Sequence, residues 1–249
     1  MPNKFIKRAL PFQHGGEKAE MKVYEIEGDG DLAWIDCSDP EDAGLLDRVT
    51  RGLAVMNRSR TIELEVGASD VPGDWVETDC PRRPAYGTVL LSERAVSVFG
   101  SLLTDAGYLL DTSSAFETRY KLFICEREID ALDLERSDLR RFRTGNISDV
   151  FRHELHADRL RDQHVFRLKY RPSRVFVSDR VVDLVREHGL TGFVFEEIWS
   201  SETGGVQLPP AVLPIERVPG EFARRAAAKR RALRQELARR AGGTPGQTS

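Results

Sequence analysis

Alternating apolar and polar positions predict several β-strands along the chain. Residues 21–27 and 61–66 alternate in this way, which is the pattern of a strand that buries one face. A short apolar run at residues 32–36 predicts another strand, separated from the first by a turn at residues 28–30, where two glycines flank an aspartate. Further strands are expected at residues 120–125, 129–133, 165–170, 174–177 and 192–195, the last of them as a final, buried strand.

Apolar residues three or four positions apart predict three helices. Asp39, Ser92 and Ser178 each stand before such a stretch, and Asp and Ser are preferred caps for the N-terminus of a helix. The helix after Ser92 is expected to end near Gly107. The helix after Ser178 should end at Gly189, because glycine favours a helix C-terminus. The apolar positions are Leu45, Leu46, Val49 and Leu53 in the first helix, Ala95, Val96, Phe99, Leu102 and Leu103 in the second, and Val181, Val182, Leu184 and Val185 in the third.

The intermixed helices and strands indicate an α+β fold. No regular βαβα series occurs, so we expect a mixed, mostly antiparallel sheet packed by a few helices, with a basic C-terminal helix. Residues 1–220 are predicted to form one domain, of which the N-terminal portion, about residues 1–80, could be a subdomain. Residues 221–249 are predicted to form a helix rich in Ala and Arg, followed by a frayed tail.

Six apolar residues are predicted to share one core. Each alternating strand must bury one face, and the helices after Ser92 and Ser178 carry apolar stripes that match such a sheet. Truncation of Phe193 to alanine should then cost about 3–5 kcal/mol of stability. The six residues are Phe123, Phe166, Val175, Val177, Phe193 and Phe195.

Composition and charge indicate a folded protein with an acidic body. Of the 249 residues, 40% are hydrophobic and 31% are charged, and no stretch approaches the roughly 18–20 consecutive apolar residues of a membrane span. The chain has 37 basic and 40 acidic residues, but residues 221–240 hold eight basic and two acidic ones, which leaves residues 1–220 with a net charge of −9. An acidic body disfavours nucleic acid and favours a basic protein surface as partner, although solubility alone also explains a mildly acidic protein.

The cysteines and the N-terminus predict a cytoplasmic protein. Cys37, Cys80 and Cys125 are odd in number and far apart, which argues against a disulfide framework and against a Cys-rich zinc site. The first residues are basic, but the apolar run of roughly 7–15 residues that marks a secretory signal does not follow them. A reduced, cytosolic location is the simplest interpretation.

The sequence contains no complete motif for a known catalytic or nucleotide-binding site. It lacks G-x-x-x-x-G-K-[ST], G-x-G-x-x-G and G-x-S-x-G. The run His-Glu-Leu-His at residues 153–156 resembles part of a zinc-protease helix, but that motif needs its second histidine where Ala157 stands. With Asp158, Asp162 and His164 nearby, a metal site is an alternative, and a polar surface segment is the favoured interpretation.

Two further features suggest chemistry less strongly. Asp130 and Asp133 lie three apart on an expected strand, so their side chains should point to opposite faces, and a structural or turn role is favoured over a catalytic pair. Basic residues at 221–240 could bind nucleic acid, but they occur all round the helix without aromatic residues for base stacking. A solvated helix beside the acidic body is favoured, and Leu233 and Leu237, one turn apart, could dock it weakly on that body. No catalytic residue, metal ligand or cofactor is therefore predicted.

Several short motifs follow one another from the middle of the chain onward. They are GTVLLSER at residues 87–94, YKLF at 120–123, IDALD at 129–133 with Ser137, VFRL at 165–168, VFVSDR at 175–180 and GLTGFVF at 189–195. In order and spacing they resemble the immunity protein 11 family, formerly a domain of unknown function, over roughly residues 70–200. The sequence differs from the family pattern at Thr88, where proline is expected, and in its basic C-terminal helix.

The resemblance implies a protein that binds another protein and catalyses no reaction. Members of this family are encoded beside polymorphic toxins of contact-dependent or type VI secretion systems, so the implied partner is a cognate toxin from the adjacent gene. Such a protein needs a stable scaffold and a surface that blocks the toxin, and the resemblance transfers no toxin-binding residues. Two alternatives stay open: an enzyme with an unrecognised site at residues 153–164, and a nucleic-acid-binding regulator acting through the Arg-rich tail.

Overall fold

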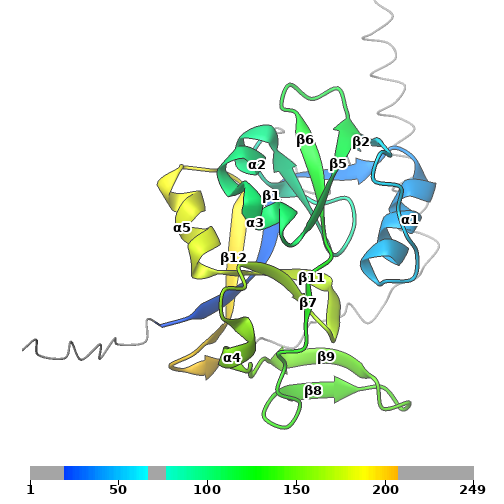
Figure 1. Ribbon diagram of the computed structural model, residues 1–249. Helices are drawn as coiled ribbons and strands as arrows, with labels where there is room; N and C mark the ends of the chain where they lie inside the picture. Colours follow the sequence, from blue (N-terminus) through cyan, green and yellow to red (C-terminus); the bar gives the residue numbers. More distant parts are fainter. Residues whose placement is uncertain (1–19, 67–76, 207–249) are drawn as a thin grey trace, which may run out of the picture.

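Strands dominate the computed structural model, which describes residues 20–66 and 77–206, without the side chains of residues 29–34 (Figure 1). Helices occupy fewer residues. The strands are β1 (Lys22–Cys37), β2 (Ile62–Val66), β3 (Pro81–Arg82), β4 (Thr88–Ser92), β5 (Gly107–Ser113), β6 (Tyr120–Cys125), β7 (Glu128–Ile129), β8 (Asp138–Arg141), β9 (Ile147–Arg152), β10 (Val165–Leu168), β11 (Arg171–Ser178), β12 (Phe193–Ser200) and β13 (Gly204–Gly205). The helices are α1 (Pro40–Thr50), α2 (Glu93–Phe99), α3 (Ser101–Thr104), α4 (Ala157–Leu160) and α5 (Asp179–Glu187).

One large sheet joins most of these strands. Its main path is β4-β6-β5-β2-β1-β11-β10-β7, with β12 and β3 also beside β1, and β13 beside β12. Most pairs are antiparallel, and the parallel ones are β1 with β3, β2 with β5, and β7 with β10. Strands β8 and β9 form a separate two-stranded sheet. The predicted α+β class, with a mixed and mostly antiparallel sheet, is confirmed.

Strand β1 is continuous where the sequence predicts two strands and a turn at residues 28–30, so that prediction was wrong. Gly28 continues the strand and pairs with Phe193 of β12. A Cβ at Gly28 would lie 2.2 Å from the carbonyl oxygen of Pro81, so only glycine lets β3 approach the strand this closely. The glycine therefore serves a close backbone contact, and it does not reverse the chain.

Helix α1 begins as predicted. Asp39 has an extended backbone, and its carboxylate accepts a hydrogen bond from the Glu41 N–H at 2.9 Å. Leu46 is buried beneath the helix. Leu53, predicted to continue the apolar stripe, instead lies beyond the helix end and is 71% exposed, because the chain leaves the helix at Gly52 with φ +72°.

The other two predicted helices also form, with one correction. The Ser92 hydroxyl accepts a hydrogen bond from the Ala95 N–H at 3.1 Å, as an N-cap should. The predicted single helix up to Gly107 is wrong, because Gly100, at φ +51°, separates α2 from the short α3. Helix α5 follows Ser178 and ends before Gly189, whose φ is +57°.

The strand predictions at 61–66, 120–125, 165–170 and 174–177 correspond to β2, β6 and the β10–β11 hairpin. The prediction at 129–133 holds only at its start, since β7 ends at Ile129 and Leu132 makes a single isolated bridge to Leu155. The strand expected at 192–195 continues to Ser200 as β12, and β13 follows it, so it is not the final strand.

The predicted core is divided between two sides of the sheet. Phe123, Val175 and Val177 are buried in one cluster beneath α2 and α5, as predicted. Phe166 belongs to a different cluster with Phe176, because neighbouring residues of β10 point to opposite faces. A third cluster lies under α1 and contains Ile35, Leu46, Ile62, Leu90 and Leu122.

Phe193 and Phe195 are only partly buried, which corrects a second part of that prediction. Their rings stack with centroids 5.9 Å apart at the margin of the first cluster, and Phe99 of α2 packs edge-on against Phe193 at 5.7 Å. Because the Phe193 ring keeps contact with solvent, its truncation should cost less than the value expected of a fully buried phenylalanine.

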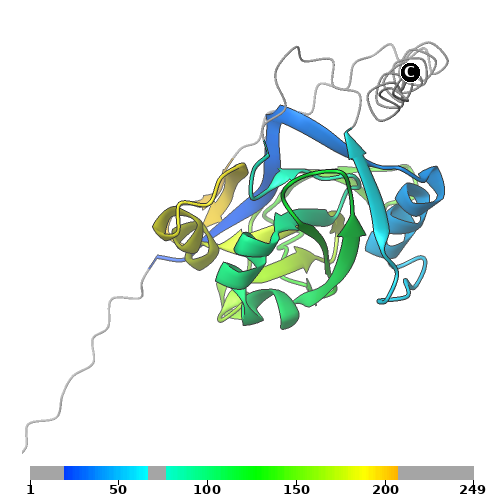
Figure 2. The same cartoon turned by 90° about the horizontal axis from the view of Figure 1, so that it is seen from above.

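The arrangement of the elements places α5 and α1 at opposite sides of the molecule, with α2 and α3 next to α5 (Figures 1 and 2). The β8–β9 pair lies at one end, away from β2 and β5. Among the helices of residues 20–66 and 77–206, none has the length and apolar character needed to cross a bilayer. The predicted basic helix at 221–240, with Leu233 and Leu237, lies outside the described residues.

Candidate interaction surface around Tyr86

Tyr86 has an aromatic side chain that is exposed to solvent. It stands in the turn between β3 and β4 and is 59% exposed. A single exposed apolar residue needs no explanation, but an exposed tyrosine whose surroundings fix its ring is a feature of binding surfaces. The residues that contact this ring therefore indicate whether the turn is a binding surface.

Two guanidinium groups lie against the Tyr86 ring. The Cζ atom of Arg83 is 5.6 Å from the ring centroid, and that of Arg174 is 6.0 Å from it. Arg83 comes from the same turn, whereas Arg174 comes from β11, almost ninety residues further along the chain. Cations at this distance from an aromatic face attract it, by roughly 0.5–1 kcal/mol at an exposed site. The two contacts restrict the ring to one region of the surface.

Two carboxylates of β1 hold both arginines in place. Glu27 Oε1 accepts hydrogen bonds from Arg83 Nη2 at 2.9 Å and from Arg174 Nη1 at 2.7 Å. Glu25 also accepts a hydrogen bond from Arg174 and is only 4% exposed. We call these five residues, Glu25, Glu27, Arg83, Tyr86 and Arg174, the Tyr86 surface.

The two ends of this network differ in their electrostatics. Burial raises the pKa of the Glu25 carboxyl above its ordinary value, and Arg174 opposes that rise. Burial works against the charge of Arg174, yet Glu25 and Glu27 raise the pKa of its guanidinium. Arg174 therefore stays charged and compensates the buried Glu25 carboxylate. Its hydrogen bonds to Glu25 and Glu27 fix the position of its guanidinium.

A shallow hollow beside Tyr86 completes the surface. It is lined by the side chains of Glu27 and Arg82 and by the turn residues 83–86. Its lining combines charged residues with Pro84, Ala85 and Tyr86. Such a hollow suits a protein side chain at an interface better than a free small molecule, which usually needs a deeper site.

The end of α1 packs directly behind the Tyr86 turn. Gly87 has φ +76°, and a Cβ at this position would lie 2.8 Å from the Cβ of Thr50. Arg167 secures the same contact from β10, because its buried guanidinium donates to the carbonyl oxygen of Thr50. The C-terminal end of α1 therefore supports the backbone next to Tyr86. In the loop after α1, Leu53 and Val55 are exposed by 71% and 95%.

A comparison with protein-family models identifies the family of this chain. The model of the Imm11 immunity protein family matches residues 77–200. The chain belongs to the Imm11 family. No curated protein matches it. The Imm11 segment contains Arg83, Tyr86 and Arg174, whereas the two glutamates that position the arginines lie on β1, outside the segment.

The favoured interpretation of residues 153–164 as a polar surface segment was wrong for its first three residues, which are buried, whereas Asp158 and Asp162 are exposed as it predicts. His153 is 0% exposed, and Glu154 and Leu155 are also buried. Glu154 pairs with Arg152 at 2.7 Å, and the His153 ring packs edge-on against Phe176. The segment turns inward because β9 ends there and the chain closes over the second core cluster.

The other polar residues of that stretch do not converge on a site. His164 Nδ1 lies 2.9 Å from the hydroxyl oxygen of Ser178, at the start of α5. Asp162 adopts φ +60° in the turn before β10, His156 precedes α4, and Asp158 is exposed within it. Across residues 20–66 and 77–206, no three His, Cys, Asp or Glu side chains gather as metal ligands would.

Asp130 and Asp133 have separate structural roles in the Imm11 segment. Asp133 Oδ1 accepts hydrogen bonds from the backbone N–H groups of Glu135 and Arg136, at 3.0 and 3.1 Å. Those bonds form a turn and lower the pKa of the Asp133 carboxyl. Asp130 instead pairs with Lys169 at 2.9 Å. The two carboxylates therefore have different partners.

The three cysteines are free and buried. Burial raises the pKa of the Cys37 and Cys125 thiols to about 12, and it also raises the pKa of Cys80. A thiol with such a pKa is protonated at neutral pH and is a poor nucleophile. The cysteines therefore act as small core residues of the Imm11 protein.

Sequence reasoning missed all five residues of the Tyr86 surface. Glu25 and Glu27 occupy the polar positions of the alternating run at 21–27, so the pattern predicts solvent for them. One signal was available: the turn at 81–86 combines two prolines, two arginines and a tyrosine. Tyr and Arg are enriched at interfaces, so the composition of this turn is the feature of the sequence that indicates a binding surface.

Proposed function

We propose that the protein binds one cognate bacterial toxin and neutralises it by stoichiometric, non-covalent binding, with the Tyr86 surface as a principal contact. Membership of the Imm11 family supports the immunity role. The observation that carries the choice of surface is the exposed Tyr86 ring, held by Arg83 and Arg174. Tyrosine and arginine dominate the binding energy of many interfaces.

The preparation of the surface before binding supports this choice. Association costs free energy when side chains must be ordered, at about 0.5–1.5 kcal/mol for each flexible side chain. Both arginines here are already fixed by Glu27 and, for Arg174, by Glu25. The toxin therefore meets a surface whose flexible side chains have one arrangement. This lowers the cost of binding and favours a slow dissociation.

The proposed function also specifies the origin of the toxin and the place of neutralisation. The partner is a toxin of a contact-dependent or type VI secretion system, encoded by the adjacent gene, and neutralisation takes place in the cytoplasm of the producing cell. Residues 1–220 act as one binding domain, and residues 221–249 are an appendage. The net charge of −9 over residues 1–220 supports faster association with a basic toxin. Neither a catalytic role nor nucleic-acid binding forms part of the proposal.

The experiment is a titration of purified toxin with purified full-length protein. Inhibition should saturate near equal molar amounts, and protection at substoichiometric amounts would contradict the proposal, because it would mean enzymatic action. Tyr86→Ala should raise Kd by about tenfold or more while leaving Tm nearly unchanged, since the ring is mostly exposed. The matched control is Tyr108→Ala, which removes a partly buried ring that also lies beside an arginine, Arg58, at 4.6 Å. This control should lower Tm and leave Kd unchanged; the reverse pattern would exclude the Tyr86 surface.

A further inference from the structure

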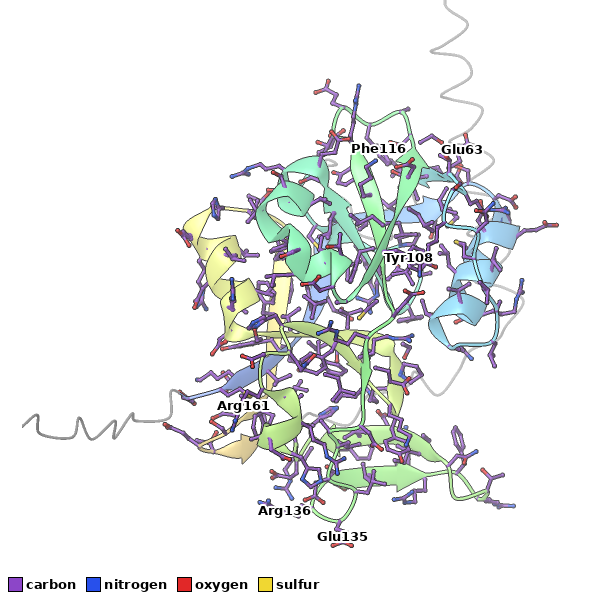
Figure 3. All side chains as sticks on the ribbon, in the orientation of Figure 1. Glu63, Tyr108, Phe116, Glu135, Arg136 and Arg161 are labelled. Carbon is purple, nitrogen blue, oxygen red and sulfur yellow. The ribbon has the colours of Figure 1, made fainter. Side chains whose placement is uncertain are left out.

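The β8–β9 arm, residues 138–152, stands apart from the main sheet. Its two strands pair only with each other. It lies at the end of the molecule opposite β2 and β5 (Figure 1). Figure 3 shows Glu135 and Arg136, in the loop that leads into β8, at this same end with their side chains directed away from the body. The arm is therefore accessible to a second molecule.

The sequence at the turn of the arm places three arginines beside an exposed phenylalanine, and the guanidinium of Arg140 lies over the Phe151 ring, 5.4 Å from its centroid. Every residue from 140 to 146 is exposed, and Phe142 is 61% exposed. Arg141 and Arg143 flank Phe142 in the sequence, and Arg140 precedes them. A bulky apolar ring among cationic side chains gains nothing from its position in the folded monomer. The same combination of aromatic and arginine side chains is enriched in the centres of protein interfaces.

The positive charge of this tip is largely uncompensated. Arg141 Nη1 donates to the carbonyl oxygen of Gly145 at 3.1 Å, which orients the guanidinium without neutralising it. Arg140 Nη2 lies 3.3 Å from a carboxylate oxygen of Asp149, but Asp149 is shared with Arg171. Within the described part of the chain, no carboxylate forms an ion pair with Arg141 or Arg143. The tip of the arm is thus a local patch of positive charge on a protein whose net charge is negative.

The arm is also built to hold this tip in one conformation. The Phe142 N–H donates to the Asn146 carbonyl at 2.8 Å, and the Gly145 N–H donates to the Phe142 carbonyl at 2.9 Å. Gly145 has φ +87°, a conformation that favours glycine. At the base, Val150 is buried in the second core cluster and Arg152 pairs with Glu154. The tip is thus ordered before any partner binds, which reduces the cost of association.

We infer that the tip of the β8–β9 arm inserts into a local, carboxylate-lined recess of the toxin, whose surface is basic elsewhere. This inference rests on the proposed function and specifies the chemistry of a second contact. Arginine guanidinium groups match carboxylates through paired hydrogen bonds, and a protruding turn requires a recess. A protein is favoured over nucleic acid because Asp138 and Asp149 interrupt the positive charge along the strands, so that no continuous track for phosphates exists.

The test uses the full chain and the purified toxin. Two variants change the tip: Arg141→Glu with Arg143→Glu, and Phe142→Ala. The matched control is Arg180→Glu with Arg186→Glu, two exposed arginines at α5 whose reversal changes the net charge equally. Kd and the association rate are measured at low and moderate salt, and Tm verifies folding. A photo-crosslinking phenylalanine analogue at position 142 then identifies the toxin peptide that meets the tip.

The expected result is a loss of affinity of about tenfold or more for the tip double variant, mostly through slower association at low salt. Phe142→Ala should accelerate dissociation, the control should stay within about twofold of wild type, and crosslinks should reach a peptide rich in Asp or Glu. Equal losses for the tip and control variants would overturn the inference, while stoichiometric inhibition by the wild type would leave the proposed function standing. A wild type that does not bind the toxin would overturn both. Tight binding of a short DNA duplex, abolished by the tip variant, would also overturn the inference.

Discussion

The burial of His153 predicts that the protein loses stability on mild acidification. The imidazole is 0% exposed, and within the described residues neither ring nitrogen has a hydrogen-bond partner. Burial, together with nearby Arg171, lowers the pKa of His153 from 6.5 to about 3, against an opposite effect of Asp149. The folded protein therefore keeps this histidine neutral at pH values where the unfolded chain protonates it.

The magnitude follows from the difference between these two pKa values. A group whose pKa is lowered by folding contributes stability that is present above its unfolded pKa, and this contribution falls as the pH drops from about 6.5 towards 3. At pH 5.0, about 1.5 pH units below its pKa in the unfolded chain, the histidine is protonated in the unfolded state only. This protonation stabilises the unfolded state by about 2 kcal/mol relative to pH 7.5. Glu25, whose pKa is raised by burial, acts with the opposite sign, but it is present in both proteins, so a comparison between variants isolates His153.

The assay is urea denaturation of the wild type and His153→Leu at pH 7.5 and pH 5.0. Leucine has a similar size and no unsatisfied nitrogen, so the variant should be as stable as the wild type at pH 7.5 or more so. Its loss of stability on acidification should be smaller than that of the wild type by about 2 kcal/mol. If both proteins lose the same free energy between the two pH values, the reasoning from a neutral, buried imidazole is refuted.

Two further predictions test the charged groups that stabilise the fold. Arg174→Ala leaves Glu25 buried and should cost about 3 kcal/mol in urea denaturation, whereas the double variant Glu25→Gln with Arg174→Met should cost clearly less; an equal cost would contradict the ion-pair argument. Asp79 accepts hydrogen bonds from Ser92 Oγ at 2.7 Å, Arg94 Nη1 at 3.1 Å and the backbone N–H of Thr191 at 2.9 Å, so Asp79→Ala should lower the free energy of unfolding by about 3 kcal/mol in the same assay.

The sequence predicts this fold well where the determinants are local. The caps at Asp39 and Ser92 depend on one side chain and on the N–H groups two or three residues later. The strand at 120–125 is a short, mostly apolar run, and its prediction matches β6. Family motifs in the right order then supplied the immunity role, which no single motif carries.

Prediction from sequence fails where a residue responds to a distant segment. Gly28 resembles a turn residue until Pro81 is placed 2.2 Å from the position of its missing Cβ. Glu25 occupies a polar position of an alternating strand, and only Arg174, far along the chain, makes its burial tolerable. The β8–β9 pair escapes detection because Arg140 and Arg141 leave the short β8 without an apolar alternation.

Strand β1 has a consequence for how this family member can be divided. It pairs with β11 along one side and with β12 along the other, yet it precedes the segment that the family model matches. A fragment cut at the family boundary would lose a shared central strand and expose two open backbone edges at once. Such edges recruit any extended segment that fits, including another copy of the fragment. Residues 22–28 thus complete the sheet between β11 and β12, and the segment that the family model matches is shorter than the sheet to which it belongs.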